Sequence, residues 1–383
     1  MKFKNLSHTP RIGILGGGQL ARMSAYAAYQ LGFEVVIWET TPASPAANIT
    51  KHDFAGSILD DTLLRRFADA CDVITLENEF IDAERLHFLE SLGKKVFPSS
   101  KTIGLIQDKF VQKRTLARKG IPVPKFMEIK GAGDYLRAAK QVGLPFLLKS
   151  RKMGYDGYGN ATVFTQKDFS DTIARLQERH SALMGESFVN FKKELAIMVV
   201  RTKKETCVYP VVESIQENHI CKKVIAPAAI TPAIAASATD IAVAAVEAVN
   251  GYGIFGIELF LTQNGELLLN EMAPRPHNTG HYTIDACVTS QFENHIRSVL
   301  DLPLGSCGMT HKSAVMINLL GKRNGAGIPT NYHEALADPG THLHVYGKSS
   351  SRPGRKMGHI TVTGKSRDNC MMKAENAAAI TDL

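Results

Sequence analysis

Apolar runs and helical spacings alternate along the first hundred residues. Residues 11–15 form a short apolar run, and after three glycines apolar residues recur at every third or fourth position from 20 to 31. These patterns predict a strand followed by a helix. Further strands are expected at 34–38 and 73–76, with a helix at 61–70 between them. This order is typical of a parallel sheet with crossover helices.

The pattern changes at residues 120–124, where Gly-Ile-Pro-Val-Pro follows a helix expected at 108–119. Glycine and proline at this density end regular structure, so we place a domain transition there. The last fifty residues are expected to form shorter strands with a basic loop. The other expected elements are a helix at 132–142, a strand at 146–149, strands at 194–201 and 206–212, a helix at 235–249 and a hairpin at 254–272.

The hairpin carries the most informative chemistry. Asn264-Gly265 favours a two-residue type I′ turn, which would place Glu258 directly opposite Glu271, about 5 Å apart at Cβ. Two opposed carboxylates among apolar neighbours need a cation between them. Mg²⁺ with nucleotide phosphates is the commonest such partner, and Asn270 offers another oxygen. The alternative is an exposed acidic pair on a surface hairpin.

A glycine turn opens the first helix. Gly16, Gly18 and Ala21 follow the first strand with dinucleotide-binding spacing, and Glu39 ends the next strand. Glycines at a helix N-terminus let the backbone approach a phosphate, so a dinucleotide or another anion could bind there. Gln19 could point at this ligand. A tight turn without a ligand is the alternative.

Lys149 ends an apolar strand and precedes a glycine-rich loop at 153–160. A point charge combined with free backbone N–H groups can hold polyphosphate, although no Walker A motif is present. A surface hairpin is the alternative. Arg275 and His277, on the loop after the acidic hairpin, suit an anionic substrate or belong to a structural loop. Glu77, at a strand end, faces a ligand crevice or caps a helix.

Composition narrows the choice of ligand. The 383 residues predict two or three domains, and 44% hydrophobic with 21% charged residues excludes wholesale disorder. The net charge of +8 is concentrated, because residues 341–383 hold seven Lys or Arg against three Asp or Glu. A basic tail is usually solvated or contacts nucleic acid, but the Pro353-Gly354 turn inside this segment indicates an ordered loop, which favours phosphate binding. Six cysteines without CxxC pairs and the lack of an apolar run of about 20 residues predict reduced thiols, a cytoplasmic location and no membrane span.

Five stretches together carry a family resemblance. They are GGGQLARM at 16–23, MGYDGYGN at 153–160, FKKELAIMVVR at 191–201, NEMAPRPHNTGHYT at 270–283 and RPGRKMGHI at 352–360. With the strand-end Glu77 they resemble the N5-carboxyaminoimidazole ribonucleotide synthetase family of the ATP-grasp superfamily. The match runs from about residue 11 to 364, and the last two stretches are its most specific parts.

The resemblance implies an α/β ATP-grasp fold. It implies a Rossmann-like N-terminal (pre-ATP-grasp) domain at 1–107, a small α+β lid domain at 108–185 and a C-terminal α+β domain at 186–383, with a terminal β subdomain from about 325. The implied ligase activity uses ATP, Mg²⁺ and bicarbonate to carboxylate 5-aminoimidazole ribonucleotide through carboxyphosphate in purine biosynthesis. A homodimer without nucleic-acid or membrane partners is also implied.

The resemblance assigns site residues by position. ATP would contact Lys109, Lys149, Gly154, Tyr155, Asp156, Gly157, Tyr158, Gly159, Asn160, Glu186, Ser187, Phe188, Val189, Glu194, Gln216, Asn270 and Glu271. Mg²⁺ would be held by Glu258 and Glu271 with Asn270. The ribonucleotide would contact Gln19, Leu20, Glu77, Tyr155, Asp156, Arg275, His277, Lys348 and Arg355. Of these, Asp156, Arg275, His277, Lys348 and Arg355 would act on bicarbonate and the reacting amine.

The chain departs from the family pattern in places. Met153 replaces a glycine, Tyr158 a basic residue and Asn160 a glutamine, while Gln216 stands where histidine is common. The family's YEFEN reads LENEF at 76–80. The competing functions are another ATP-grasp ligase of purine metabolism, an NAD-dependent oxidoreductase if the first glycine turn is decisive, and a non-catalytic nucleotide- or RNA-binding module.

Overall fold

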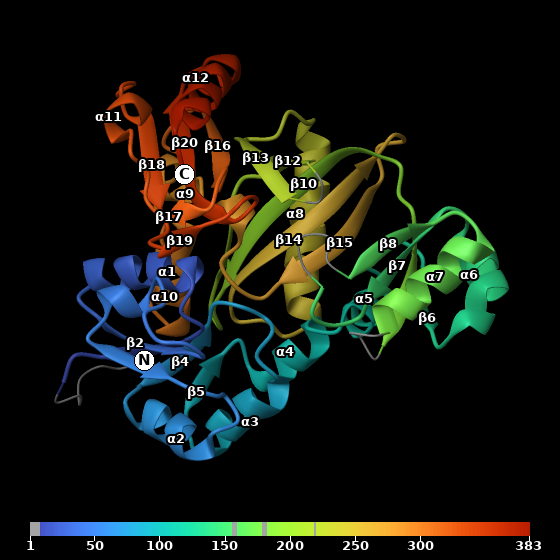
Figure 1. The fold of residues 1–383 in the computed structure, drawn as a ribbon, viewed down its shortest axis with the longest axis horizontal. Coiled ribbons are helices and arrows are strands. Elements are labelled where there is room, and N and C mark those ends of the chain that lie inside the picture. Colours follow the sequence, from blue (N-terminus) through green and yellow to red (C-terminus); the bar gives the residue numbers. More distant parts are fainter. Residues whose placement is uncertain (1–7, 155–158, 178–181, 218–219) are drawn as a thin grey trace.

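The computed structural model describes residues 8–154, 159–177, 182–217 and 220–383. It contains three main sheets (Figure 1). The first is a parallel five-stranded sheet in the order β3-β2-β1-β4-β5, as the alternating pattern predicted. Its strands are β1 Arg11–Leu15, β2 Glu34–Glu39, β3 His52–Ala55, β4 Val73–Leu76 and β5 Lys95–Phe97; the helices are α1 Gln19–Gln30, α2 Asp61–Asp69, α3 Ala83–Ser91, α4 Ser100–Ile106 and α5 Lys109–Arg118.

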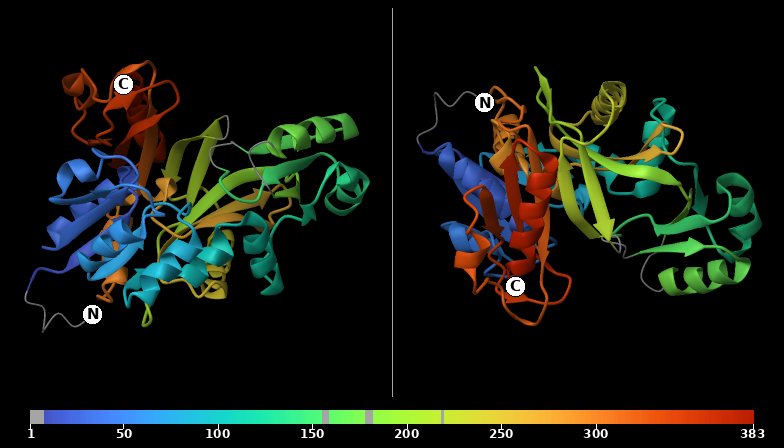
Figure 2. Two further views of the ribbon diagram at one scale, coloured as in Figure 1. Left: turned by 60° about the horizontal axis from the view of Figure 1, so that its bottom comes forward. Right: turned by 90° about the horizontal axis from the view of Figure 1, so that it is seen from above.

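The second sheet is small, antiparallel and covered by two helices. Its order is β6-β9-β7-β8, and its core includes the fully buried side chains of Phe146 and Phe169. In Figures 1 and 2 this unit projects from the molecule on the side away from the first sheet. The elements are β6 Phe126–Ile129, β7 Phe146–Ser150, β8 Asn160–Val163, β9 Leu183–Ser187, α6 Tyr135–Val142 and α7 Gln166–Gln177.

The third sheet is the largest, in the order β15-β14-β10-β12-β13-β16-β20-β18 with β11 beside β10. Helix α8 packs its buried alanines against one face of β10, β14 and β15, which leaves the other face for the site. Its strands are β10 Phe191–Arg201, β11 Thr206–Val208, β12 Val212–Glu217, β13 Ile220–Ala226, β14 Gly253–Thr262, β15 Leu267–Ala273, β16 Ser313–Leu320, β18 Thr341–Val345 and β20 Lys356–Gly364. The remaining elements are α8 Pro232–Ala248, α9 Thr283–Ala286, α10 Gln291–Val299, α11 Tyr332–Ala335, α12 Arg367–Ile380, β17 Gly325–Ala326 and β19 Ser350–Ser351.

The C-terminal segments pack onto the first sheet's helices. Phe292 and Ile296 of α10 share one apolar cluster with Ala21 and Ala25 of α1, and Tyr346 joins it. Burying such side chains is worth about 1.5–3 kcal/mol each, so this contact fixes the N-terminal unit against the C-terminal sheet.

Three expectations from the sequence are wrong. The last fifty residues include the 14-residue helix α12, whose Cys370, Ala374 and Ala377 pack into the core that includes strands β16 and β20. The strand expected at 206–212 is two strands, because Pro210 has no N–H to continue the ladder. The structure also joins Cys207 to Cys307 in a disulfide, whereas all six thiols were expected to be reduced.

The remaining cysteines agree with the sequence expectation. Cys71, Cys221, Cys287 and Cys370 are free and buried. Among the described residues, none of the helices has the length and apolar character needed to cross a bilayer.

Candidate active site

The acidic hairpin places its two carboxylates opposite each other, but its turn and its register differ from those predicted. Glu258 pairs with Glu271, which confirms the predicted opposition. The two-residue turn is wrong: Thr262 N–H donates to Glu266 O (2.9 Å) around a three-residue loop with Gly265 at φ +84°. This shifts the register by one residue, so Leu259 pairs with Leu269. A β-bulge beyond that pair shifts it back.

The two carboxylates differ in protonation because only one has a lysine partner. Lys109 forms an ion pair with Glu271 and lowers the pKa of that carboxyl to about 2. Burial, reinforced by the charge of Glu271, raises the pKa of Glu258 to about 8. Hard divalent cations prefer carboxylate oxygens as ligands, so this pair of carboxylates, which already holds the Lys109 ammonium, is suited to bind one.

The free face of the sheet carries a third carboxylate. Glu258 lies opposite Ala196 on β10, and Glu194 is two residues further along that strand, so both side chains leave the same face. Burial raises the pKa of Glu194 to about 7, and its Oε2 has no hydrogen-bond partner within the described part of the chain. Gln216 on β12 lies two residues beyond Ser214, the cross-strand partner of Glu194.

Lys149 lies in a buried charge network. Its Nζ is 2.6 Å from Glu186 Oε1, and Lys113 Nζ is 2.8 Å from Glu186 Oε2. Burial alone would raise the pKa of Glu186, but the two ammonium groups outweigh it and lower the pKa to about 2. Residues 186–189 were expected to form the hinge against adenine, which stays a prediction; the Glu186 carboxylate pairs with both lysines. Sequence reasoning missed Lys113, whose signal was its position one helical turn after Lys109.

Arg275 crosses between distant parts of the chain. Its Nε and Nη2 donate to the two carboxylate oxygens of Glu79, with Nη2 to Oε1 at 3.0 Å. Nη1 donates to Pro276 O at 3.2 Å. The bidentate pair holds the guanidinium in one orientation. Sequence reasoning missed Glu79, because nothing local connects it to a residue 196 positions away.

His277 lies beside the acidic pair as a neutral imidazole. The Thr279 hydroxyl lies 2.8 Å from its Nδ1, and its Nε2 lies 3.7 Å from Glu258 Oε1. Burial and the positive charge of Arg275 lower the pKa of His277 to about 3. The neutral ring therefore adds no positive charge, and it offers one donor and one acceptor nitrogen.

The glycine turn of the first domain is occupied by the protein's own carboxylates. Gly18 N–H and Ala21 N–H donate to Glu77 (2.6 and 2.9 Å), and Gly17 N–H donates to Glu39 (2.9 Å). These N–H groups were expected to face an anionic ligand; instead, Glu77 caps the helix, the alternative left open from sequence. The dinucleotide interpretation is therefore wrong.

The basic C-terminal segment reaches the same region. Lys348 Nζ donates to Lys356 O (2.7 Å), and Arg355 Nη1 donates to Ser350 O (2.6 Å). Burial, followed by the charge of Arg355, lowers the pKa of Lys348 to about 8, while Glu77 acts in the opposite direction. Cations of the last fifty residues thus approach the strand end of the first domain.

The other predicted residues are partly described. Gln19 and Leu20 begin α1, with Leu20 buried in the N-terminal core. Residues 155–158, with the predicted Tyr155, Asp156, Gly157 and Tyr158, lie outside the described residues. Of the remainder, Gly154 and Gly159 flank that gap, Asn160 begins β8, Ser187 ends β9, Phe188 and Val189 lead into β10, and Asn270 is the residue at the bulge of β15.

Met153, one of the departures from the family pattern, has an unusual backbone. Its φ is +63°, in the left-handed region that costs most side chains about 1–2 kcal/mol. This explains why glycine suits the position. The side chain is 57% exposed and therefore recovers little by packing.

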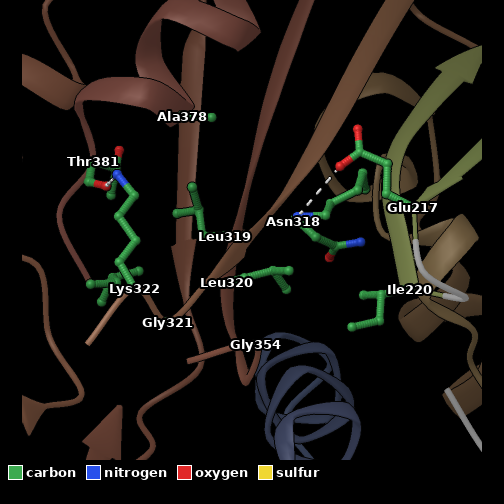
Figure 3. Close-up of a pocket in the computed structure, with 12 residues that line it drawn as sticks. Glu217, Ile220, Asn318, Leu319, Leu320, Gly321, Lys322, Gly354, Ala378 and Thr381 are labelled. Carbon is green, nitrogen blue, oxygen red and sulfur yellow. Dashed lines mark hydrogen bonds and ion pairs between the residues drawn. The ribbon is translucent and has the colours of Figure 1, made fainter. Parts of the chain in front are cut away.

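A separate cavity of about 430 Å³ lies among β13, β16 and the C-terminal segment (Figure 3). Its charged residues are paired: Lys322 donates to Thr381 O (2.8 Å), and Lys222 lies 3.8 Å from Glu217. None of the predicted site residues lines it. The cavity therefore does not compete with the acidic hairpin as the candidate site.

Comparison with family profiles divides the chain into three domains in the order expected from the sequence. Residues 9–107 match the ribonucleotide synthetase preATP-grasp domain, and residues 114–292 match the ATP-grasp domain. Residues 314–373 match the phosphoribosylaminoimidazole carboxylase C-terminal domain.

Comparison with characterised proteins extends the similarity to nearly the whole chain. The chain is 42% identical to a phosphoribosylaminoimidazole carboxylase of Ogataea methanolica, covering 94% of this chain and 67% of that protein. It is 40% identical to an N5-carboxyaminoimidazole ribonucleotide synthase of Synechococcus elongatus, covering 93% and 90%. The chain thus spans about two thirds of the fungal relative's length and most of the cyanobacterial one's.

Solved structures give the same result. The crystal structure of N5-carboxyaminoimidazole ribonucleotide synthetase from Thermotoga maritima matches with a TM-score of 0.87 and 42% identity, covering 98% of this chain and 99% of that one. An Aspergillus clavatus N5-carboxyaminoimidazole synthase in complex with ADP and 5-aminoimidazole ribonucleotide matches with a TM-score of 0.88 and 36% identity, covering 97% and 98%.

Proposed function

The chain belongs to the N5-carboxyaminoimidazole ribonucleotide synthase family of ATP-grasp enzymes, and we propose that it carboxylates 5-aminoimidazole ribonucleotide with ATP and bicarbonate. The products would be N5-carboxyaminoimidazole ribonucleotide, ADP and phosphate. The observation that carries the proposal is the opposition of Glu258 and Glu271 on a sheet face shared with Glu194. An oxidoreductase has no use for this pair, and its dinucleotide turn is already filled by Glu39 and Glu77.

The ATP end of the site rests on the sheet and the small domain. Glu258 and Glu271, with Asn270, would hold Mg²⁺, which when bound neutralises phosphate charge. Lys149 would donate to the phosphates, and Glu194 would accept from the ribose hydroxyls. Residues 154–160 and 186–189 would enclose the phosphates and adenine, with Lys109 and Gln216 at their edges. This arrangement performs catalysis by positioning and charge neutralisation.

The carboxylation end would lie where Arg275 meets Glu79 of the first domain. Bicarbonate oxygen would attack the γ-phosphorus to form carboxyphosphate and ADP. The ribonucleotide amine would then attack the carboxyl carbon, release phosphate and lose one proton, which the departing phosphate can accept. Arg275, fixed by Glu79, would orient the bicarbonate oxygens. Neutral His277, with Asp156, would position the amine. Tyr155, Gln19, Leu20 and Glu77 would contact the ribonucleotide.

One assay tests this function. ADP release from Mg-ATP and bicarbonate is expected to require 5-aminoimidazole ribonucleotide. ADP release that ignores the ribonucleotide would contradict the proposal and favour another ATP-grasp ligase. Absence of any release, with Mg-ADP still bound, would support a non-catalytic nucleotide-binding module. The homodimer, the cytoplasmic location and the domain boundaries at 107 and 185 stay predictions.

Lys348 predicts a pH dependence specific to the ribonucleotide. With a pKa of about 8, its ammonium is charged below that pH and neutral above it. A neutral Lys348 attracts the substrate phosphate less, so kcat/KM for the ribonucleotide should fall towards tenfold per unit above about pH 8. This parameter, measured from about pH 7 to 9.5, reports the free enzyme. Lys348→Met should remove the dependence and exposed Lys365→Met should retain it; a flat wild-type profile would contradict the assignment.

A further inference from the structure

Strand β15 depends on its bulge to present Glu271. Leu259 pairs with Leu269, but Glu258 pairs with Glu271, so Asn270 is the extra residue. If the Leu259 register continued without the bulge, Asn270 would oppose Glu258. Glu271 would then turn to the other face of the sheet, because side chains alternate along a strand. The acidic pair therefore exists only while the bulge is in place.

Strand β15 is also the edge of its sheet, bonded on one side to β14. An edge strand leaves its outer N–H and C=O groups in need of partners. Helix α5 supplies them at the bulge. The Gln112 side chain donates from Nε2 to Met272 O (3.0 Å) and accepts from Met272 N–H at Oε1 (3.1 Å). One amide thus replaces both hydrogen bonds of a neighbouring strand at the residue after Glu271.

The same face of α5 contacts the two preceding residues of β15. Lys113 Nζ donates to Asn270 O (2.8 Å), and Lys109 pairs with the Glu271 carboxylate. Positions 109, 112 and 113 are spaced by three and four residues, so they share one side of the helix. Three successive side chains on that side therefore bind three successive residues of the bulged strand.

Burial makes this contact specific to one register. Gln112 is 3% exposed and Lys113 is 2% exposed. A slip of β15 by one residue would leave the Gln112 amide and the Met272 backbone without these partners and without water, and Lys113 would lose its hydrogen bond to Asn270 O. Buried polar groups without partners are disfavoured, so this face of α5 selects the bulged register.

Lys113 also connects β15 to the lysine expected to bind phosphate. Its ammonium lies 2.8 Å from Glu186 Oε2, while Lys149 lies 2.6 Å from Glu186 Oε1. Without Lys113, both oxygens of Glu186 would be left to Lys149. The ammonium of Lys149 would then be held more tightly and be less available to a phosphate.

We propose that Gln112 and Lys113 are positioning residues of the nucleotide-metal site. Gln112 holds the bulge that turns Glu271 towards Glu258, and Lys113 shares the Glu186 carboxylate so that Lys149 can engage phosphate. The inference deepens the proposed function and rests on it. Neither side chain is required to touch substrate, so each acts through the strand or lysine that it holds.

The test measures binding apart from turnover. Mn²⁺, a spectroscopic substitute for Mg²⁺, is titrated in the presence of ADP and followed by electron paramagnetic resonance, with ADP affinity measured by calorimetry. Gln112→Met is expected to weaken Mn²⁺ binding about tenfold or more. Lys113→Met is expected to weaken ADP binding about tenfold, with partial rescue in Lys113→Arg. Exposed Arg118→Met, on the same helix, should behave as wild type.

Folding is separated from positioning by a second variant and a second readout. If Gln112→Met does not fold, Gln112→Asn keeps the amide but shortens it, and the same loss of Mn²⁺ affinity is expected. Where activity is present, KM for the ribonucleotide should stay within about twofold of wild type. A folded Gln112 variant with wild-type Mn²⁺ affinity, or Lys113→Met with wild-type ADP affinity, overturns the corresponding assignment. If wild type binds neither Mn²⁺ nor ADP, the proposed function itself fails.

Discussion

Replacing Glu271 by alanine is expected to abolish turnover while the fold is retained. The change removes half of the opposed carboxylate pair and the partner of Lys109. Loss of charge stabilisation at a phosphoryl-transfer site is worth several kcal/mol, so ADP release should fall by about 10³-fold or more. The Lys109 and Glu271 side chains are 21% and 40% exposed, so water can solvate the ammonium that loses its partner, which should limit the loss of stability. Ribonucleotide-dependent ADP release and thermal denaturation, measured together, check both parts.

The matched control lies on the same hairpin. Glu266→Ala removes an exposed carboxylate from the turn and should leave ADP release within about twofold of wild type. Near-normal turnover in folded Glu271→Ala would refute the assignment of this pair to the metal.

The acidic hairpin shows how much of a local structure the sequence pattern can predict. They identified the two strands and the opposed glutamates correctly from Asn264-Gly265 and the apolar runs. The turn was predicted one residue too short, and the bulge was not predicted at all. The two errors cancelled because each shifts the register by one residue. A bulge on an edge strand is selected by tertiary partners such as Gln112, which local sequence does not specify.

Long-range charge pairing explains most of what was missed at the site. Glu79 and Arg275 are far apart in sequence, and each is a charged residue of the kind usually found on the surface, so neither stands out in its own segment. The packing of α10 on α1 and the hydrogen bond between Thr75 and His295 help to bring the two domains together. Glu77 was found as a strand-end carboxylate, but sequence could not decide between ligand and helix cap. The hydrogen bonds that Gly18 N–H and Ala21 N–H donate to Glu77 show the cap, and contact with the ribonucleotide stays a prediction.

The terminal helix was missed for a different reason. Residues 367–380 contain alanines and two methionines, but no regular stripe of large apolar side chains. Periodicity is the main sequence signal for a helix, so small buried residues give a weak one. Cys370, Ala374 and Ala377 pack in the core of β16 and β20, and this packing supplies the stability that the apolar pattern did not indicate.

Lys149→Met is expected to produce the second large loss. Lys149 is the buried ammonium that the proposed function places on the ATP phosphates, and methionine keeps most of its length without its charge. Removing one such donor typically costs about 10²–10³-fold in rate. Glu186 keeps Lys113 as an ion-pair partner, so no buried carboxylate is left alone and the fold should survive. Steady-state kinetics should show a higher KM for ATP and a lower kcat, with KM for the ribonucleotide little changed.

The comparison with exposed Lys140→Met separates charge at the site from charge in general. Lys140 is in the last turn of α6, so its loss removes one positive charge from the same small domain without touching the network. It should leave the ATP kinetics of wild type unchanged. If Lys149→Met and Lys140→Met behaved alike, the phosphate-binding role of Lys149 would be wrong. The Lys113–Glu186–Lys149 network would then be structural. Loss of a buried ion pair from such a network would lower the stability of the fold, but it would not selectively raise KM for ATP.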